Sequence, residues 1–322
     1  MIIRKIKNFY RNSQPIVEVA KQYGIKERAV RFQCLVNIYI RHSNLEWYRF
    51  LSKYRYGKAY LKAFLSPKMV KKIFLQYNPS QEEINILNDK FKCNELFKKY
   101  INRAYLNMEE VSKEDVEKFL LTYNKAILKP CDSQCGIGVE VVSKIDEVLP
   151  YLGKPYVLEE VVVNHPDLKK LSSDSLNTIR IYTVKEKDHV IRALSSSIRI
   201  GAKGNIVDNA HFGSEVLPVD ITTGICYPKS VNILGEEKDT NYHCHEKYVG
   251  MKIPHWDKVI NACLECAKLF KHQRLIGWDV AVTKDGIEMI EANSKPHLHL
   301  FELTNGPSKA YFLKHWNLDS IK

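Results

Sequence analysis

Apolar residues recur at helical spacing through the first part of the chain, among many arginine and lysine residues. Two such runs extend from Ile16 to Tyr23 and from Leu45 to Tyr54, with apolar positions three or four residues apart. This spacing gathers the apolar side chains on one face of a helix. The pattern therefore predicts a helical, basic N-terminal lobe over residues 1–85.

A second helical stretch is predicted for residues 86–122, where Ser112 and Asp115 can open a helix at Glu114. Beyond it, β-branched and aromatic residues come in short runs bounded by turn residues, which is typical of strands. The predicted strands cover residues 126–128, 139–142, 156–158, 178–184, 189–194, 276–283 and 287–290. One helix, residues 256–272, interrupts them, because its apolar residues form a stripe. We therefore expect an α+β body made largely of antiparallel hairpins after the helical lobe.

The charge changes this picture more than the overall composition does. The 322 residues are 45% hydrophobic and 27% charged, which is ordinary for a folded globular protein, but the formal net charge is +12. A basic excess of this size suits an anionic partner such as a nucleotide, a nucleic acid, a lipid headgroup or an acidic glycan. Charge alone does not choose among these partners.

Targeting signals and cysteine usage indicate a cytoplasmic protein. Three cations fall within Met1 to Lys7, so this start does not resemble a secretory signal, and no segment approaches the roughly 20 apolar residues that span a bilayer. The eight cysteines are scattered along the chain, and we expect them to be reduced thiols. The basic, amphipathic run from Met1 to Arg11 allows peripheral contact with the inner face of a membrane, although a solvated helix is the default expectation.

Two acidic residues lie on a predicted hairpin whose turn contains Gly286, a residue suited to a left-handed position. If Thr283 pairs with Ile287, the antiparallel register sets Ala281 opposite Met289, Asp279 opposite Glu291, and Gly277 opposite Asn293. Because side chains alternate along a strand, Asp279, Glu291 and Asn293 then project from one face. A divalent cation removes the repulsion between facing carboxylates, and Mg²⁺ prefers such oxygen ligands.

The alternative is a pair of solvated acids on an exposed hairpin. On spacing alone the two interpretations are equally favoured. A two-residue turn would shift the register by one position and break the metal arrangement.

A turn-rich loop follows the predicted strand that ends at Lys129. Between Pro130 and Gly138 the residues are small or turn-forming, so backbone N–H groups can converge on phosphate oxygens, and Ser133 can add a hydroxyl. Lys129 would supply a point charge. The loop is no Walker motif, because the Gly-Lys-Ser/Thr ending is missing, and a simple turn is the competing interpretation. The pattern of residues 156–163 predicts a buried strand with two acids. Its backbone groups can bond to the edge of an adenine, or its acids can form a structural ion pair.

Taken in order, these pieces resemble the ATP-grasp family, and more closely its sugar-transfer-associated branch. The resemblance covers Asn88 to Asn305 and rests on the order and spacing of seven pieces. These are Asn88-Asp-Lys90, Leu128-Lys129-Pro130, the loop to Gly138, Leu158-Glu159-Glu160, Asn177-Thr-Ile-Arg180-Ile, Val207-Asp208-Asn209, and Gly277-Trp-Asp279 with Glu291-Ala-Asn293-Ser.

The resemblance implies an ATP-grasp fold, in which two α+β lobes with antiparallel sheets hold ATP between them. It assigns residues 86–165 to the first lobe, with the phosphate loop and adenine hinge, and residues 166–322 to the second, with the magnesium and substrate sites. The helical N-terminal lobe, residues 1–85, lies outside the family pattern, and its role is not readable from the sequence.

The resemblance also implies roles for individual residues. The expected nucleotide contacts are Lys90 and Lys129 at the phosphates, Ser133, Gln134, Gly136 and Gly138 in the covering loop, Glu159, Glu160, Val161 and Val162 at the adenine hinge, and Asp167 and Asn177. The expected magnesium ligands are Asp279, Glu291 and Asn293. Arg180, Arg199 and Lys129 are the expected catalytic residues, because their charges suit an acyl phosphate. For Arg199 a solvated strand position is an equally good interpretation.

The sequence departs from the family pattern at two places. Where the family usually has a double glycine after Asp-Asn, this chain has Ala210-His211-Phe212-Gly213, and where it often has Pro-Gly, this chain has Lys295-Pro-His297-Leu-His299. Both segments fall where the second substrate is expected. We therefore take Asn209, His211, Lys295 and His297 as candidate substrate contacts, with merely structural roles more common for such histidines.

The resemblance predicts an ATP- and Mg²⁺-dependent ligase that joins a carboxylate to an amine through an acyl phosphate. The branch suggests an amino acid or amine joined to a sugar acid or glycan-linked carboxylate in surface polysaccharide synthesis. A small-molecule or sugar kinase, or a nucleotide-binding module without catalysis, remain the alternatives.

Two further patterns favour other functions less strongly. Glu18 to Val30 resembles a helix-turn-helix with Gly24 at the turn, but the body of the chain looks enzymatic, so no nucleic-acid partner is expected. Cys263 and Cys266 suggest zinc, but they lie within a predicted helix and no matching pair has the required spacing.

Overall fold

The chain forms two compact units, and each is described by itself. The computed structural model describes residues 2–36, 57–133, 136–186, 189–201, 215–232, 235–239 and 247–316. Unit 1 comprises Met1–Ile73, Ser230–Lys238 and His297–Lys322, and unit 2 comprises Phe74–Lys229 and Asp239–Pro296. These units follow contacts in space, and the division into three domains along the sequence stays a prediction.

Unit 1 begins with a helical hairpin. Helices α1 (Ile2–Gln22) and α2 (Glu27–Leu35) turn at Gly24, whose φ of 70° is easily adopted without a side chain. Their facing sides bury Ile16, Val17, Val19, Ala20, Val30 and Cys34. The remaining elements of the unit are α4 (Lys58–Ala63), most of α5 (Pro67–Tyr77), β8 (Ser230–Asn232), β9 (Glu237–Lys238), α12 (Leu298–Asn305) and α13 (Lys309–Trp316). The predicted helical character is confirmed for the described residues before position 86.

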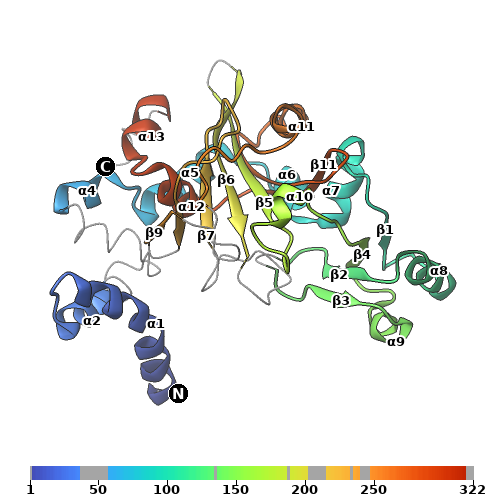
Figure 1. The fold of residues 1–322 in the computed structure, drawn as a ribbon, viewed down its shortest axis with the longest axis horizontal. Coiled ribbons are helices and arrows are strands. Elements are labelled where there is room, and N and C mark those ends of the chain that lie inside the picture. Colours follow the sequence, from blue (N-terminus) through green and yellow to red (C-terminus); the bar gives the residue numbers. More distant parts are fainter. Residues whose placement is uncertain are drawn as a thin grey trace. The chain divides into compact units, whose positions relative to one another are not determined.

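Unit 2 contains two sheets that occupy different parts of the chain. The smaller sheet has the order β1-β4-β2-β3, with antiparallel neighbours throughout. Its elements, with the helices that precede and accompany it, are α6 (Gln81–Asn88), α7 (Lys90–Leu96), η2 (Lys98–Tyr100), β1 (Tyr105–Asn107), α8 (Lys113–Tyr123), β2 (Ala126–Pro130), β3 (Glu140–Val142), α9 (Ile145–Val148), η3 (Leu149–Tyr151) and β4 (Tyr156–Glu160). Figure 1 shows α8 and α9 beside this sheet.

Helix α8 forms where the sequence predicts it, and its start explains why. The Ser112 side chain accepts a hydrogen bond from the Asp115 backbone N–H at 3.1 Å, and the Asp115 carboxylate accepts one from the Ser112 backbone N–H. The helix then buries Val116, Phe119 and Leu120 against the smaller sheet. This apolar face gives the first lobe its own core.

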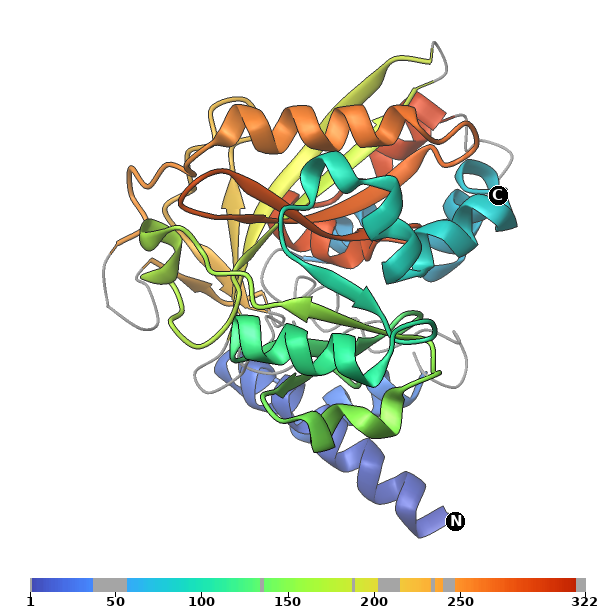
Figure 2. The same cartoon turned by 90° about the vertical axis from the view of Figure 1, so that its right-hand side faces the viewer.

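The larger sheet of unit 2 runs β11-β10-β5-β6-β7, and each described neighbouring pair is antiparallel. Its elements are α10 (Pro166–Lys169), β5 (Thr178–Lys185), β6 (Ile191–Ile200), β7 (Glu215–Val219), α11 (Trp256–Lys268), β10 (Leu275–Val282) and β11 (Ile287–Asn293). Helix α11 lies across this sheet, as the orange helix in Figure 2 shows. The face toward α11 is apolar and includes Ile179, Ile181, Ile198, Leu217, Trp278 and Val280. The opposite face carries the charged side chains of Arg180, Arg199 and Asp279.

The predicted strands are confirmed as elements, but several boundaries differ. Strand β6 extends to Ile200, six residues past the predicted end, and α11 ends at Lys268 instead of residue 272. The continuous helical stretch predicted for 86–122 is wrong at Tyr105–Asn107, because these residues pair with β4 as an edge strand. Pairing with a distant strand is a tertiary effect that local spacing does not reveal. Among the helices that the structure describes, none is long and apolar enough to cross a membrane.

Candidate active site

The β10–β11 hairpin confirms the pairing of the two acids but corrects how it arises. Asp279 lies opposite Glu291, and Gly277 lies opposite Asn293. The predicted pairs Thr283–Ile287 and Ala281–Met289 are wrong, because Val282 pairs with Ile287 and Val280 with Met289. The chain turns more tightly than predicted, with the Thr283 N–H donating to the Gly286 carbonyl at 2.9 Å.

A β-bulge restores the register that the tighter turn shifts. The irregularity falls between Asp279 and Val280 and leaves Ile290 without a directly opposite residue. Ile287 and Met289 therefore join the apolar face, whereas Glu291 and Asn293 share the Asp279 face. Gly286 does not have the positive φ that the sequence suggested, so the turn does not require a glycine for that reason.

Asp279 is almost completely buried and is held by two arginines from neighbouring strands. Arg180 on β5 donates from Nε to Oδ1 at 2.6 Å and from Nη2 to Oδ2 at 2.9 Å. Arg199 on β6 reaches Oδ2 at 3.0 Å and also donates to the Thr178 hydroxyl. The structure thus brings both predicted arginines to the face that carries Asp279. The solvated position considered for Arg199 is wrong, because its side chain is largely buried.

The two facing carboxyls have different environments. Burial disfavours ionisation of Asp279, but the charges of Arg180 and Arg199 outweigh it and hold the pKa of Asp279 below its ordinary value. Burial and the nearby Asp279 charge raise the pKa of Glu291. Asn293 donates from Nδ2 to Asp279 Oδ2 at 3.3 Å.

This donor set fits magnesium better than a softer metal. The two carboxylates and the amide carbonyl on this face are all oxygen ligands. A divalent cation bound to them would favour the ionised form of Glu291 and so lower its raised pKa. Among the described residues, no group of three or more His, Cys, Asp or Glu side chains is arranged to hold a metal. Cys263 and Cys266 lie buried inside α11 as free thiols, so the zinc interpretation is not supported for this pair.

Lys129 lies in the first lobe and is paired with a carboxylate. Its Nζ is 2.6 Å from Glu159 Oε2, and both side chains are buried. Burial lowers the pKa of Lys129, while the Glu159 charge opposes that change. The same environment acts on Glu159, where burial is outweighed by Arg103 and Lys129 and the pKa falls to about 2.

Lys90 approaches the predicted phosphate loop from the start of α7. Its Nζ donates to the Ser133 carbonyl and lies 3.4 Å from the Ser133 hydroxyl, and its backbone N–H donates to the Cys131 carbonyl at 2.9 Å. Gly136 and Gly138 both have positive φ, at 68° and 74°, which suits a tight loop. Gln134 lies outside the described residues. The structure thus joins Lys90 to the loop, and the role of both at the phosphates stays a prediction.

The predicted hinge leaves the smaller sheet at the end of β4. Glu160 is the last strand residue and accepts from the Ala104 N–H at 3.1 Å, while Val161 and Val162 continue without regular structure. Asp167 lies exposed on α10 and is 3.2 Å from the Lys170 ammonium. Asn177 is fully buried and donates to the Leu168 and Ser172 carbonyls, so it holds the loop before β5.

The structure describes two of the four candidate substrate residues. Asn209 and His211 lie outside the described residues. Lys295 is exposed at the end of unit 2, two residues beyond Asn293. His297 belongs to unit 1, where it precedes α12 as its exposed N-cap residue.

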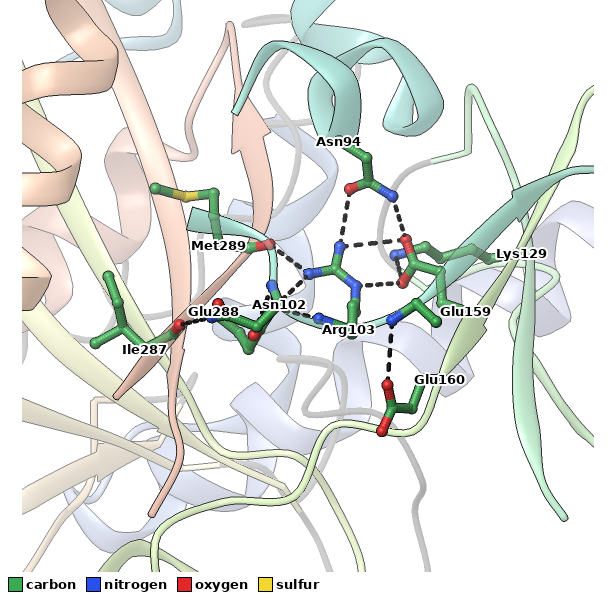
Figure 3. A network of polar contacts seen from close by, with 10 residues as sticks. Asn94, Asn102, Arg103, Lys129, Glu159, Glu160, Ile287, Glu288 and Met289 are labelled. Carbon is green, nitrogen blue, oxygen red and sulfur yellow. Dashed lines mark hydrogen bonds and ion pairs between the residues drawn. The ribbon is translucent and has the colours of Figure 1, made fainter. Parts of the chain in front are cut away.

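Sequence reasoning missed a set of buried residues beside Lys129. Arg103 contacts Glu159 and also Glu288 on β11, and Asn94 donates to Glu159 at 2.8 Å (Figure 3). Arg103 falls within residues 86–122, which the sequence predicted to be a helical stretch without a site residue other than Lys90. Only the strand pairing of Tyr105 with Glu159, which lies close by, could have drawn attention to it.

Comparison with known proteins decides the family. The model of the sugar-transfer associated ATP-grasp family matches residues 142–317, which is more than half of the chain. The chain belongs to this family. Both the predicted family and the predicted ATP-grasp fold class are thereby confirmed, in agreement with the two antiparallel sheets of unit 2. No curated protein matches the sequence.

Solved ATP-grasp structures resemble the chain at low sequence identity. The N5-carboxyaminoimidazole ribonucleotide synthase of Aspergillus clavatus is 15% identical over 67% of this chain and 47% of its own, with a TM-score of 0.45. The ATP-grasp ligase PsnB is 14% identical over 74% of this chain and 60% of its own, with a TM-score of 0.44. The corresponding synthetase of Thermotoga maritima is 13% identical over 76% and 51%, with a TM-score of 0.43. The chain thus spans about half the length of these proteins.

Proposed function

We propose that the protein is an ATP- and Mg²⁺-dependent ligase that joins a carboxylate to an amine through an acyl phosphate. Membership of the ATP-grasp family supports the use of ATP. The observation that carries the proposal is the polar face of the larger sheet. There Arg180 and Arg199 form ion pairs with Asp279, which shares its face of the hairpin with the other candidate metal ligands, Glu291 and Asn293.

Each group of the candidate site suits one requirement of phosphoryl transfer. Lys90 and Lys129 provide cations for the phosphates, and the loop around Gly136 provides backbone N–H groups. Asp279, Glu291 and Asn293 would hold Mg²⁺, which neutralises charge on the transferred phosphoryl group when bound.

The arginines suit the chemistry that follows. A substrate carboxylate oxygen attacks the γ-phosphorus, the bond to the bridging oxygen breaks, and ADP leaves with the electron pair. An amine then attacks the acyl carbon, phosphate departs, and the nitrogen loses a proton to solvent. Arg180 and Arg199, already paired to a carboxylate in a buried setting, are suited to stabilising the anionic acyl phosphate.

The substrate class rests on the family and on charge. We infer an amino acid or amine joined to a sugar acid or a glycan-linked carboxylate in surface polysaccharide synthesis, supported by the sugar-transfer association of the family. The net charge of +12 and the exposed Lys295 beyond the metal strand suit an acidic substrate. Because the proposed reaction uses ATP and Mg²⁺, we infer a cytoplasmic enzyme. Peripheral contact with the inner face of the membrane is part of the same proposal.

Trapping with hydroxylamine tests the proposal without requiring the amine to be known. The full chain is incubated with ATP, Mg²⁺, hydroxylamine and a panel of sugar acids and amino acids. We expect a hydroxamate and an equal amount of ADP for the cognate carboxylate, and neither product when ATP or the carboxylate is omitted.

Other outcomes identify other functions. ADP release with a phosphorylated hydroxyl and no hydroxamate would mean a kinase. ATP binding without release of ADP under any condition would mean a nucleotide-binding module without catalysis. Either result would overturn the proposed ligase activity.

A further inference from the structure

Arg103 lies in the segment that enters β1 and is one of the most deeply buried charged residues of unit 2. Its side chain is 2% exposed. Figure 3 shows it between the smaller sheet and strand β11, with its guanidinium facing both. An arginine can make several directed hydrogen bonds from one planar group, so it can join two elements at once.

On the side of the first lobe, Arg103 holds Glu159. Its Nε donates to Oε2 at 3.0 Å, and Nη2 lies 3.2 Å from Oε1. The same Nη2 donates to Asn94 Oδ1 at 2.8 Å, and Asn94 donates in turn to Glu159 Oε1. The carboxylate is therefore fixed in position from three directions, with Lys129 as the third partner.

On the other side, Arg103 holds the strand that carries the candidate metal ligands. Its Nη1 donates to the Met289 carbonyl at 2.7 Å and to Glu288 Oε2 at 3.2 Å. The Asn102 backbone N–H also donates to both Glu288 oxygens, at 2.9 and 3.1 Å. Two residues past Met289, the same strand presents Glu291. Arg103 thus fixes the lobe-1 segment next to the metal strand.

The shared carboxylate links Arg103 to the availability of Lys129. Glu159 Oε2 is contacted by the Arg103 guanidinium at 3.0 Å and by the Lys129 ammonium at 2.6 Å. Arg103 also contacts Glu288, and because it shares the Glu159 carboxylate, Lys129 is not the only cation that Glu159 holds. Without Arg103, Glu159 would hold Lys129 as its only cation, and a phosphate would have to compete against it.

We propose that Arg103 is a positioning residue for nucleotide binding. By sharing the Glu159 carboxylate, it keeps Lys129 available to the phosphates. Through its bonds to Glu288 and the Met289 carbonyl, it holds this arrangement beside strand β11, which carries the candidate magnesium ligands. This inference rests on the proposed function, because it concerns the same ATP and Mg²⁺ site. It assigns no chemical step to Arg103, which touches no reacting atom.

The affinity of the full chain for the β,γ-imido analogue of ATP with Mg²⁺ tests this role. Titration calorimetry compares wild type, Arg103→Met, Arg103→Lys and the double variant Arg103→Met/Glu159→Gln. The matched control is Arg274→Met, which removes a partly buried arginine of unit 2 that donates to the Lys185 carbonyl. Circular dichroism checks that each variant is folded.

The expected pattern separates positioning from support of the fold. Arg103→Met weakens binding about tenfold, as for the loss of one charge-assisted hydrogen bond. The double variant recovers to within about threefold of wild type, because the carboxylate that would hold Lys129 is gone. Arg103→Lys binds less tightly than wild type, since an ammonium cannot reach both Glu159 and Glu288, and Arg274→Met binds like wild type.

Three results would overturn the inference. These are unchanged affinity in Arg103→Met, a double variant no better than the single one, and full affinity in Arg103→Lys. If Arg103→Met does not fold, the double variant and Arg103→Lys still test the inference, because an affinity relative to wild type is predicted for each of them. A wild-type chain that binds no nucleotide would instead refute the proposed function, and the inference with it.

Discussion

Glu159 is a buried carboxylate that two cations share. Its carboxylate contacts Arg103 and Lys129 and accepts a hydrogen bond from Asn94. Burial alone would raise its pKa, yet the two cations prevail and bring it to about 2. Removing one partner from such a buried set costs more than the set contributes as a whole, because the remaining charge is left uncompensated.

The depressed pKa of Glu159 predicts how stability depends on pH. Since its pKa falls from 4.5 to about 2 on folding, its contribution is present above about pH 4.5 and lost as pH falls toward 2. The lost stability is on the order of 3 kcal/mol. Urea unfolding across this window should show a shallower pH dependence in Glu159→Gln than in wild type. Glu114→Gln, at an exposed position on α8, should keep the wild-type slope, and equal slopes in all three proteins would contradict the assignment.

The hairpin of β10 and β11 shows what could be predicted at the scale of elements and what could not. Period-two spacing and the acid pair predicted both strands and the contact of Asp279 with Glu291, because these follow from local alternation. The sequence analysis named a tighter turn only as an alternative that would break the arrangement, and it missed the bulge at Ile290, which cancels the shift that the turn causes. Met289 and Ala292 both lie in the core of unit 2 with residues from distant elements, and such packing cannot be read from a single strand sequence.

The same limit explains the missed Arg103. The candidate nucleotide and metal residues follow a family pattern along the chain, so their identities were readable from the sequence. The partners of Arg103 are Glu159, 56 residues away, and Glu288, 185 residues away. Such contacts exist only after the two sheets have formed, and nothing in the local sequence distinguishes Arg103 from a surface residue.

Strand β10 also contains a position where only glycine fits. A Cβ on Gly277 would lie 2.5 Å from the Pro296 Cβ and 3.5 Å from Arg180 Nη1. We expect Gly277→Ala to lose about 1–3 kcal/mol of stability, as overpacking does, and to weaken ATP binding by displacing Pro296, which follows the candidate metal ligand Asn293 in the chain. Gly286→Ala is the matched control in the same hairpin, since no atom lies within 4 Å of its added Cβ. Thermal unfolding and nucleotide titration measure both effects, and equal behaviour of the two variants would refute this packing argument.

At the scale of the whole molecule, the candidate nucleotide and metal residues that the structure describes lie in unit 2, whose core joins α11 to the larger sheet. Cys263 and Cys266 lie inside this core as free thiols. Burial raises the pKa of Cys266 to about 12 and that of Cys263 well above its ordinary value. Both thiols should therefore react with alkylating reagents only when unit 2 opens.

Nucleotide binding should slow this reaction. A ligand that binds only the folded state at about 100 times its Kd stabilises it by about 2.7 kcal/mol, so alkylation of Cys263 and Cys266 should slow about 100-fold with ATP and Mg²⁺. Mass spectrometry of the labelled peptides measures each site separately. The control omits the nucleotide and keeps Mg²⁺, and rates unaffected by ATP would mean that the folded unit does not bind it.

The central claim is that the polar face of β10 and β11 holds magnesium for a reaction on ATP. Glu291→Gln tests it most directly, because the amide keeps the shape of the side chain and removes the charged ligand. Turnover of ATP with the cognate carboxylate should fall at least about 100-fold, while affinity for ATP changes less than about tenfold. Glu265→Gln, an exposed acid on α11, should keep both values. Wild-type turnover in Glu291→Gln would contradict the account.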